Sequence, residues 1–386
     1  MSIELREVTT DRALKKFIRF PRKLYKGNKY WVPSLFFDEY NTLHWKKNPA
    51  FEKCEAKYWM AYRDGKAVGR VAAILNHPFI EKWGDRYLRF GWIDFEDDPE
   101  VSSALMGAVE GWAKAEKLTA VHGPLGFTDQ DHEGMLVDGF EELGTLATIY
   151  NHPYYVTHLE ALGYAKDVDW VEYQITVPKE PIEKISRAAE IVKKRLDLRL
   201  LDIKKKKELI PYAMELFHIL DKEYSHLYGT VPMTEAQMKG YVDQYFGFVL
   251  VDMVPIVVNE AGEMVAFGVV MPSLSRALQK SNGEILPLGF VHLLKALKKN
   301  DLADMYLVAV KSEYQGKGVN ALLMDQILRS MIARGITLAE SNPELETNVA
   351  VRSFWKYFEH RQHKRRRCVI KHFTPRFREA VEPTKE

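Results

Sequence analysis

Alternation of hydrophobic and polar positions predicts a β-hairpin in each half of the chain. Residues 57–62 and 67–74 are two runs rich in β-branched and aromatic residues, and Asp64-Gly65 lies between them. An Asp-Gly pair between two such runs is a strong local signal for a hairpin turn. Residues 254–258 and 264–271 form a similar pair of runs. Both halves are therefore expected to contain a sheet.

Apolar residues at helical spacing predict helices among these strands, most clearly in residues 101–117 and 209–228. Further helices are expected at 10–20, 154–162, 182–195, 320–334 and 349–358, and further strands at 90–95, 119–122, 169–177, 199–202, 304–310, 336–339 and 365–373. The same order of elements occurs in both halves. The prediction is an α/β fold, with a mixed α+β sheet in each of two tandem domains.

A proline-containing stretch, Pro178-Lys179-Glu180-Pro181, separates the two halves. At 386 residues the chain is too long for one ordinary core and about right for two domains. We expect a first domain at 1–178, a connecting helix at 179–195 and a second domain at 196–373. Residues 374–386 are polar and are expected to form a disordered tail.

The composition is that of a soluble globular protein, with 46% hydrophobic and 28% charged residues. A net charge of +2 gives no reason to expect nucleic-acid binding. The sequence has no signal-peptide pattern and no apolar run long enough to span a bilayer, so a cytoplasmic protein is expected. Cys54 and Cys368 form no ligand motif and no H-E-x-x-H occurs, so no metal is expected.

The strand expected at 304–310 leads into a glycine-containing loop, residues 315–320, that opens a helix. The first N–H groups of a helix have no partner within it and lie at the positive end of the helix dipole. Glycines allow a ligand to approach the backbone closely, and Lys317 adds positive charge. The loop is thus a candidate diphosphate site, although glycine is also common in ordinary strand-to-helix turns. The patterns of nucleotide P-loops and dinucleotide folds are absent.

The segment Val308-Ala309-Val310, followed by Tyr314-Gln315-Gly316-Lys317-Gly318, resembles the coenzyme A motif of the GCN5-related N-acetyltransferase (GNAT) superfamily. That motif is Q/R-x-x-G-x-G/A after a strand. The resemblance implies that the loop binds the pyrophosphate and the strand contacts the pantetheine arm. The implied cofactor-binding residues are Leu307, Val308, Val310, Gln315, Gly316, Lys317, Gly318, Val319 and Asn320. Asn320 replaces the last Gly or Ala but still supplies an N–H.

A later motif of the superfamily, an Asn followed by a helix that carries a Tyr, is matched only in part. Asn348 and Trp355 lie near the expected positions and are assigned to cofactor binding by the resemblance. Trp355 has no hydroxyl, so it cannot protonate a leaving thiolate. The acid of the standard mechanism is therefore absent at this position.

The first half resembles the same fold with an altered cofactor loop. Its hairpin and the Asn151-x-x-Tyr154 pattern match, but residues 96–100 are Glu-Asp-Asp-Pro-Glu. An acidic loop repels a diphosphate, so this domain is not expected to bind coenzyme A. As a whole the chain resembles a group of bacterial tandem proteins of the superfamily and, more distantly, acyltransferases proposed to N-acylate long-chain bases.

The resemblance implies direct transfer of an acetyl or longer acyl group from coenzyme A to an amine. A backbone N–H of strand 304–310 is the expected oxyanion stabiliser. Asp304 and Glu340 are the candidate catalytic carboxylates for contact with the amine. Each also has an ordinary explanation, since Asp304 can be a solvated strand start and Glu340 a salt-bridge partner. Glu346 is a third carboxylate that could contact the amine, and its ordinary explanation is a cap of the helix that follows it.

Alternatives remain open for the acceptor and for catalysis. Residues 285–294 are unusually apolar and are followed by lysines. They fit a protein core, or the wall of a fatty-chain tunnel near a membrane surface. The acceptor is thus a small or a lipid-like amine, and peripheral membrane contact is one option. A non-catalytic coenzyme A sensor is a further alternative, whereas transfer from aminoacyl-tRNA is disfavoured by the coenzyme A loop. The charge run 364–367 is expected at a solvated strand edge.

Overall fold

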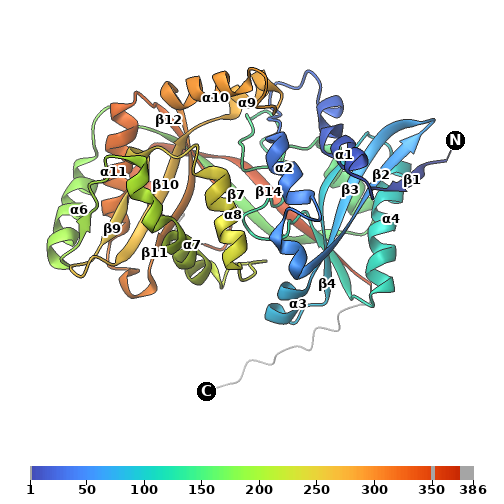
Figure 1. Ribbon diagram of the computed structural model, residues 1–386, viewed down its shortest axis with the longest axis horizontal. Coiled ribbons are helices and arrows are strands. Elements are labelled where there is room, and N and C mark those ends of the chain that lie inside the picture. The colour runs from blue at the N-terminus through green and yellow to red at the C-terminus, as the bar shows by residue number, and fades with distance from the viewer. Residues whose placement is uncertain (1, 349–352, 374–386) are drawn as a thin grey trace.

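The computed structural model describes residues 2–348 and 353–373 (Figure 1). Within them a 14-stranded mixed sheet runs through both halves of the chain, in the order β1-β2-β3-β4-β5-β14-β7-β12-β11-β10-β9-β8, with β6 and β13 beside β14 and β7. The strands are β1 Glu4–Glu7, β2 Cys54–Arg63, β3 Lys66–Asn76, β4 Tyr87–Phe95, β5 Ala120–Gly123, β6 Met135–Asp138, β7 Ala165–Thr176, β8 Arg199–Leu200, β9 Ile256–Val258, β10 Met264–Pro272, β11 Leu302–Val310, β12 Leu338–Ser341, β13 Glu344–Leu345 and β14 His360–His372.

Helices cover both faces of this sheet, so the predicted mixed α/β fold is confirmed. They are α1 Asp11–Leu24, α2 Phe36–Leu43, α3 His77–Trp83, α4 Pro99–Ala115, α5 Tyr154–Ala161, α6 Glu183–Arg195, α7 Ile210–Tyr224, α8 Glu235–Tyr245, α9 Ser275–Ser281, α10 Gly289–Lys298 and α11 Asn320–Ala333, with 3-10 turns at Pro49–Glu52, Lys206–Leu209, Val251–Met253, Ser312–Tyr314 and Ser353–Tyr357. No helix in the described ranges has the length and apolarity needed to cross a bilayer.

Both predicted hairpins are present, as β2–β3 and β9–β10. In the first, Asp64 and Gly65 have φ of 50° and 75°. Positive φ at both central residues is the requirement of the turn that matches the twist of two paired strands. The strand expected at 199–202 is reduced to β8, and the helix expected at 349–358 lies partly outside the described residues, as does the whole tail 374–386.

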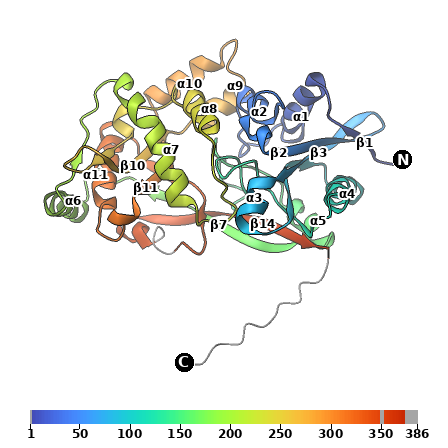
Figure 2. The ribbon, with the colours of Figure 1, turned by 60° about the horizontal axis from the view of Figure 1, so that its bottom comes forward.

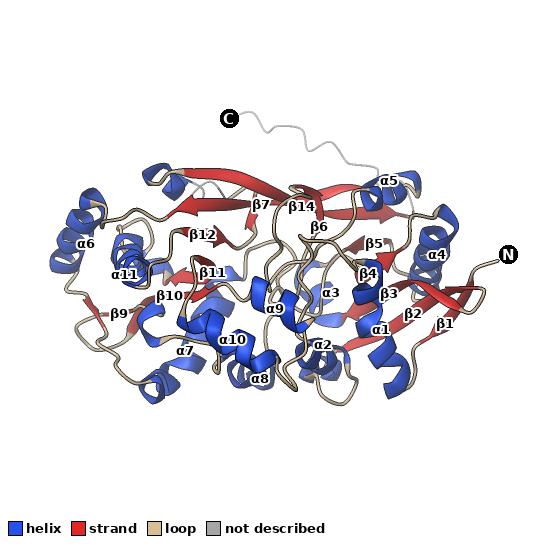
Figure 3. Cartoon of the chain, turned by 90° about the horizontal axis from the view of Figure 1, so that it is seen from above, coloured by secondary structure: helices blue, strands red, loops and turns tan. Residues whose placement is uncertain are grey.

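Two long strands join the halves. The last strand, β14, lies between β5 and β7, and β7 in turn pairs with β12 of the second half. Cα partners such as Val369 with Gly123 and Arg365 with Val171 define these pairings. Figures 2 and 3 show β7 and β14 reaching from one half into the other. The strand β14 therefore comes from the second half of the sequence but pairs with two strands of the first half, and β7 of the first half pairs with β12 of the second.

The helix α6, expected to connect two domains, packs against α11 in the core of the second half. Its residues Ile185, Ala189 and Val192 are buried there. The domain limits at 178 and 196 stay a prediction. Helix α8 was not predicted, because Met238 is its one fully buried residue and an apolar period is missing.

Candidate active site

The strand β11 is paired on one side along its length and on the other only at its start. It pairs antiparallel with β10 from Ala303 to Val310 and parallel with β12 as far as Met305 and Ser341. The register of the β10–β11 pairing shifts between Val269 and Val270, opposite Leu307 and Met305. Such an irregularity bends a strand locally. Beyond Met305 the two parallel strands separate, and β11 has an open edge that faces β12.

Val308 shows how this edge is oriented. Its partner Gly268 donates its N–H to Pro255 on the other side of β10, at 3.0 Å. Gly268 and Val308 are therefore a non-hydrogen-bonded antiparallel pair, in which the N–H and C=O of Val308 point away from β10. The hydroxyl of Tyr224, on α7, donates to that carbonyl at 2.7 Å. The edge thus offers a backbone amide to a ligand chain that contains amides, such as pantetheine.

The loop after β11 leads into a helix start without a side-chain cap. Gly316 and Gly318 have φ of 70° and 86°, a region that favours glycine. Among the described residues, no hydrogen-bond acceptor takes the backbone N–H groups of Gly316, Gly318, Val319 and Asn320. Four free amides at a helix N-terminus fit the diphosphate of coenzyme A.

Side chains from two other helices hold this loop. The buried carboxylate of Glu223, on α7, accepts hydrogen bonds from Ser312 Oγ at 2.6 Å and Gln315 Nε2 at 3.0 Å. Gln315 Nε2 also donates to the carbonyl of Val310 at 2.9 Å. Arg195, on α6, donates to the carbonyl of Lys317 at 2.7 Å. The Gln315 side chain therefore shapes the loop, while the backbone remains available for a ligand.

The corresponding loop in the first half is arranged differently. Asp98 caps α4 by accepting the N–H of Glu100 at 2.9 Å, and it also forms an ion pair with Arg63. The gap beyond the paired part of β4 and β5 is filled by the chain itself, since Leu125 N–H donates to Phe90 O at 2.8 Å. The helix start and the strand edge, which stay open in the second half, are therefore occupied in the first half.

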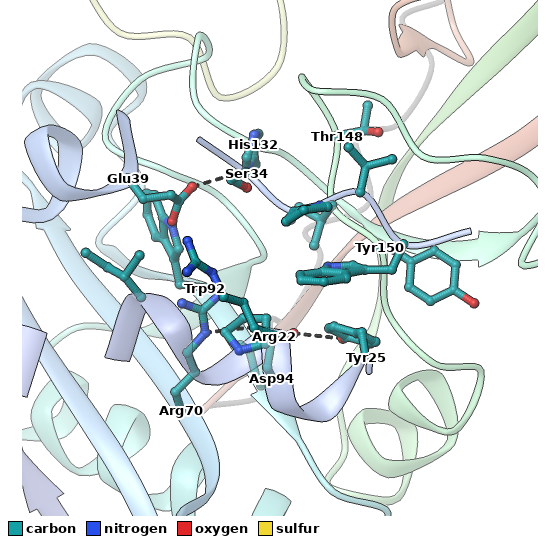
Figure 4. A pocket seen from close by; sticks show the side chains of 17 residues that line it. Arg22, Tyr25, Ser34, Glu39, Arg70, Trp92, Asp94, His132, Thr148 and Tyr150 are labelled. Atoms are coloured by element: carbon teal, nitrogen blue, oxygen red, sulfur yellow. Dashed lines mark hydrogen bonds and ion pairs between the residues drawn. The ribbon is translucent and has the colours of Figure 1, made fainter. Parts of the chain in front are cut away.

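A cavity of about 60 Å³ lies nearby in the first half (Figure 4). Inside it Arg70 Nε lies 2.7 Å from Asp94, and the Tyr25 hydroxyl donates to the same carboxylate at 2.8 Å. Small-molecule sites usually enclose roughly 300–1,000 Å³. The cavity is therefore too small for coenzyme A.

Asp304 and Glu340 lie side by side on β11 and β12, where they are Cα partners. Both are buried. Tyr306 donates its hydroxyl to Asp304 Oδ2 at 3.2 Å, and Asp304 Oδ1 has no hydrogen-bond partner among the described residues. Burial, followed by the nearby Glu340 carboxylate, raises the pKa of Asp304 to about 7. Asp304 is thus not a solvated strand start.

Glu340 is buried beside positive charge. The ammonium group of Lys364 contacts its carboxylate, and His363 Nε2 lies 3.4 Å from Glu340 Oε1. Burial alone would raise the pKa of Glu340, but Lys364 and then His363 outweigh it, so that the pKa is lowered. The pKa values of the two neighbouring carboxyls are therefore shifted in opposite directions. Glu340 stays ionised, while Asp304 exchanges a proton near neutral pH.

The charge run at 364–367 was wrongly expected at a solvated edge. Lys364 and Arg366 are fully buried, and both contact Glu172 on β7. The period of two in β14 places these two side chains on one face, which is the signal that sequence reasoning missed. Glu172, Glu340 and His363 lie close enough to hold a metal ion. Lys364 already supplies a cation to both carboxylates.

The remaining predicted residues have partners within the protein. Trp355 is buried in the second-half core, and its Nε1–H donates to Glu344 at 2.9 Å. The backbone N–H of Asn348 donates to Leu345 O at 2.9 Å. Glu346 forms ion pairs with Lys166 and Arg365. Contact of Asn348 or Trp355 with coenzyme A stays a prediction.

Comparisons with known proteins agree with this geometry. The family model of the Acetyltransferase (GNAT) family matches residues 214–359. Protein YghO of Escherichia coli (strain K12) is 31% identical over 367 residues, which cover 93% of this chain and 92% of that protein. A protein of Caulobacter vibrioides (strain NA1000 / CB15N) named bacterial ceramide synthase is 29% identical over 325 residues, 80% of each chain.

Two solved structures share the fold. One is a tandem GNAT protein from the clavulanic acid biosynthesis pathway, with a TM-score of 0.56 and 13% identity over 97% of this chain and 99% of that one. The other is the glucosamine N-acetyltransferase region of a fungal multi-domain β-N-acetylglucosaminidase, with the same TM-score and identity over 96% of this chain and 38% of that one. The chain belongs to the GNAT acetyltransferase family, as a member with two tandem domains.

Proposed function

We propose that this protein is an acyl-coenzyme A-dependent N-acyltransferase that transfers an acetyl or longer acyl group directly to an amine. One observation carries the proposal. The open edge of β11 leads into an uncapped helix start, and the same strand bears Asp304, whose pKa lies near neutrality. When bound, acyl-coenzyme A supplies a thioester carbonyl that a neutral amine can attack.

The second half provides the binding groups for this donor. The free amides of Gly316, Gly318, Val319 and Asn320 hold the diphosphate, assisted by the dipole of α11 and the charge of Lys317. The N–H of Val308 binds the pantetheine arm along the open edge. Since both sets are backbone groups, their function depends on the shape of the loop and strand more than on particular side chains.

Asp304 acts as the general base. An amine is mostly protonated near neutral pH and must lose a proton before or during attack. A buried carboxylate with a pKa of about 7 accepts that proton efficiently, because its pKa lies near the working pH. Glu340 stays ionised and holds Lys364. In this proposal it is a positioning residue.

Tyr224 donates the proton that the leaving thiolate needs. Its hydroxyl lies at the open edge, bonded to Val308 O, and burial raises its pKa to about 12. It is therefore protonated at neutral pH and available as an acid. This assignment gives to α7 the role that Trp355, which has no hydroxyl, cannot fill.

A long-chain, lipid-like amine is the favoured acceptor class. A ceramide is an amide of a fatty acid with a long-chain amino alcohol, and one relative, similar over 80% of this chain, is named a ceramide synthase. The apolar residues around α10, which are exposed, support the same class. A short amine with an acetyl donor is the alternative within the same reaction.

Donor binding tests the site. Thermal unfolding is measured with coenzyme A and with acetyl-, octanoyl- and palmitoyl-coenzyme A, because ligands of the native state raise the midpoint. Gly316→Asp places a carboxylate beside the free amides, whereas Gly316→Asn has the same shape without the charge. Asp and Asn tolerate positive φ better than most residues. We expect Gly316→Asp to lose the stabilisation and Gly316→Asn to keep most of it.

Gly335→Asp is a matched control, because Gly335 also has φ of 70° and open space where a Cβ would stand, but lies at the other end of α11. It should keep full donor binding. If no donor shifts the midpoint and direct titration also detects no binding, the proposed cofactor site is wrong.

Acyl transfer separates an enzyme from a coenzyme A sensor. Each donor is incubated with a set of primary amines that includes long-chain amino alcohols, and products are identified by mass spectrometry. Amide formation with long-chain acceptors supports the favoured class, and amide formation with short amines alone supports the alternative. Donor binding without amide formation across the set would instead identify a binding protein.

A further inference from the structure

Four large apolar side chains are exposed within nine residues of the second half. Leu286, Leu288, Phe290 and Leu294 have exposed fractions of 74%, 66%, 42% and 60%. Leu286 and Leu288 lie in the turn before α10, and Phe290 and Leu294 lie on the helix itself, at the edge of its buried stripe. Within the described residues, the other exposed large apolar side chains are scattered singly, at Trp83, Ile191, Ile210 and Val308. Single exposed apolar residues are ordinary, but a cluster marks an interaction surface.

Core packing does not explain this cluster, which we call the α10 face. Leu293 and Leu297 of α10 are buried, and they pack with Leu274 and Leu278. Phe290 and Leu294 are one helical turn apart and flank this buried pair, so they widen the same apolar stripe toward solvent. The apolar stripe of α10 therefore extends beyond the part that its own fold covers.

Lysines border the α10 face. Lys295, Lys298 and Lys299 are exposed, and none of them forms an ion pair among the described residues. The nearest acids along the chain are engaged elsewhere, since Glu284 lies 2.7 Å from Arg22 and Asp301 lies 2.5 Å from Arg276. The positive charge is thus uncompensated, and apolar residues next to free lysines are complementary to a surface that is apolar inside and anionic outside.

We infer that the α10 face binds the surface of an anionic lipid bilayer. Leu286, Leu288, Phe290 and Leu294 enter the boundary between headgroups and acyl chains, and the lysines contact the headgroups. The contact is peripheral, with the helix lying in the plane of the interface. This binding goes beyond the proposed reaction and does not depend on it.

The position of α10 gives the contact a consequence. Helices α9 and α10 connect the end of β10 to the start of β11, whereas the diphosphate loop follows the end of β11. Figure 1 shows α9 and α10 together at one end of the second-half strands. Asp304 lies near that same end of β11. If the proposed function holds, a lipid-like amine reaches Asp304 from the bilayer side, and the polar coenzyme A enters from the opposite side.

Vesicle sedimentation tests the inference with the full-length protein. Binding is compared between vesicles of phosphatidylcholine alone and of phosphatidylcholine mixed with phosphatidylglycerol. We expect binding to the mixed vesicles that weakens as salt is raised. A triple variant, Leu286→Ser, Leu288→Ser and Leu294→Ser, should weaken it by roughly tenfold or more, because each buried apolar side chain contributes to insertion.

A second variant tests the charge, with Lys295, Lys298 and Lys299 all changed to Gln. Each lysine near an anionic surface raises the binding affinity about fivefold, so the affinity for mixed vesicles should fall by roughly 100-fold. The matched apolar control is Ile191→Ser with Ile210→Ser, which are comparably exposed but isolated. The matched charge control changes exposed lysines elsewhere, Lys193, Lys194 and Lys207, to Gln. Both controls should bind like the wild type.

Every variant is checked for its thermal midpoint and for its midpoint shift with coenzyme A, so that misfolding is recognised. Absence of vesicle binding by the wild type overturns the inference. Equal binding by the α10 variants and the controls does so as well. Light scattering examines a second copy as the occupant: dimers that the leucine variant abolishes, without vesicle binding, would assign the α10 face to self-association and refute the bilayer contact. None of these readouts requires catalysis.

Discussion

Asp304 and Glu340 are neighbouring buried carboxyls whose surroundings push their pKa values in opposite directions. Lys364 and His363 lie beside Glu340, whereas Asp304 has Tyr306 and an unpaired Oδ1. Two adjacent carboxyls with separated pKa values are a common arrangement for acid–base work. The same pair lowers stability when both are ionised, so catalysis and stability can be examined with the same substitution.

The rate of the proposed reaction should depend on the ionisation of Asp304. With a pKa of about 7, the base is protonated at acid pH, so kcat/KM should rise with pH through that value and then level off. Asp304→Asn removes the base and should lower kcat/KM by roughly 100-fold or more. The check is a pH–rate profile of both proteins. A profile of unchanged shape in the variant would refute the assignment.

Asp304 should also make stability depend on pH in an unusual direction. Its pKa in the folded state, about 7, lies above the ordinary value of 3.8, so folding favours the protonated form. The stabilisation is fully present below the unfolded pKa and is lost as pH rises through about 7. Asn imitates the protonated carboxyl. We expect Asp304→Asn to gain about 2 kcal/mol relative to the wild type between about pH 5 and about pH 8.

Chemical denaturation at several pH values measures this difference. Asp252→Asn is a suitable control, because Asp252 forms a partly exposed ion pair with Arg334. A relative stability of the Asp304 variant that does not vary with pH would show that Asp304 is ionised throughout.

Tyr224 is expected to affect turnover more than donor binding. Tyr224→Phe removes the hydroxyl at the open edge and leaves the ring, so kcat should fall roughly 100-fold while the Kd for coenzyme A changes little. Tyr212→Phe, on the same helix α7, controls for the loss of a phenol from that helix. Equal kcat values for the two variants would remove Tyr224 from the mechanism.

At the level of elements, the site depends on how α7 holds the loop after β11. Glu223 accepts two hydrogen bonds from this loop, and one of its own oxygens has no partner among the described residues. Glu223→Ala removes both bonds, so donor binding must then order the loop as well. We expect roughly tenfold weaker coenzyme A binding, measured by titration. Lys222→Ala, at an exposed residue that is also on α7, should leave the affinity unchanged; an equal loss there would point to a general effect on the helix.

Local elements were predictable because their signals are local. The Asp64-Gly65 turn marks a hairpin, and the glycines at 316 and 318 mark a loop between β11 and α11. Both depend on the conformations of a few adjacent residues. Helix α8 escaped prediction because its contacts bury too few apolar residues to produce a period.

Long-range pairings were not predictable in this way. The burial of Lys364 and Arg366 requires Glu172, which lies far away in the sequence, and a run of four basic residues is usually solvated. The candidate site was therefore predictable in its backbone part and in the carboxylates Asp304 and Glu340. The charges that set their pKa values come from β7 and β14, whose pairing only the folded chain reveals.

For the whole molecule, the position of β14 couples the two halves. The strand follows the second half in sequence, yet Val369 is buried in the core formed by β3, β4, β5 and α4. Val369→Ala should therefore destabilise the first half by about 1–3 kcal/mol, the usual cost of removing buried methyl groups. Hydrogen exchange followed by mass spectrometry should show faster exchange in β4 and β5, as well as in β14. Val308→Ala, at the exposed edge of β11, is the control and should leave the first half unchanged. Because β7 and β14 are shared, we also expect one cooperative unfolding transition, and two separate transitions would show that the halves fold independently.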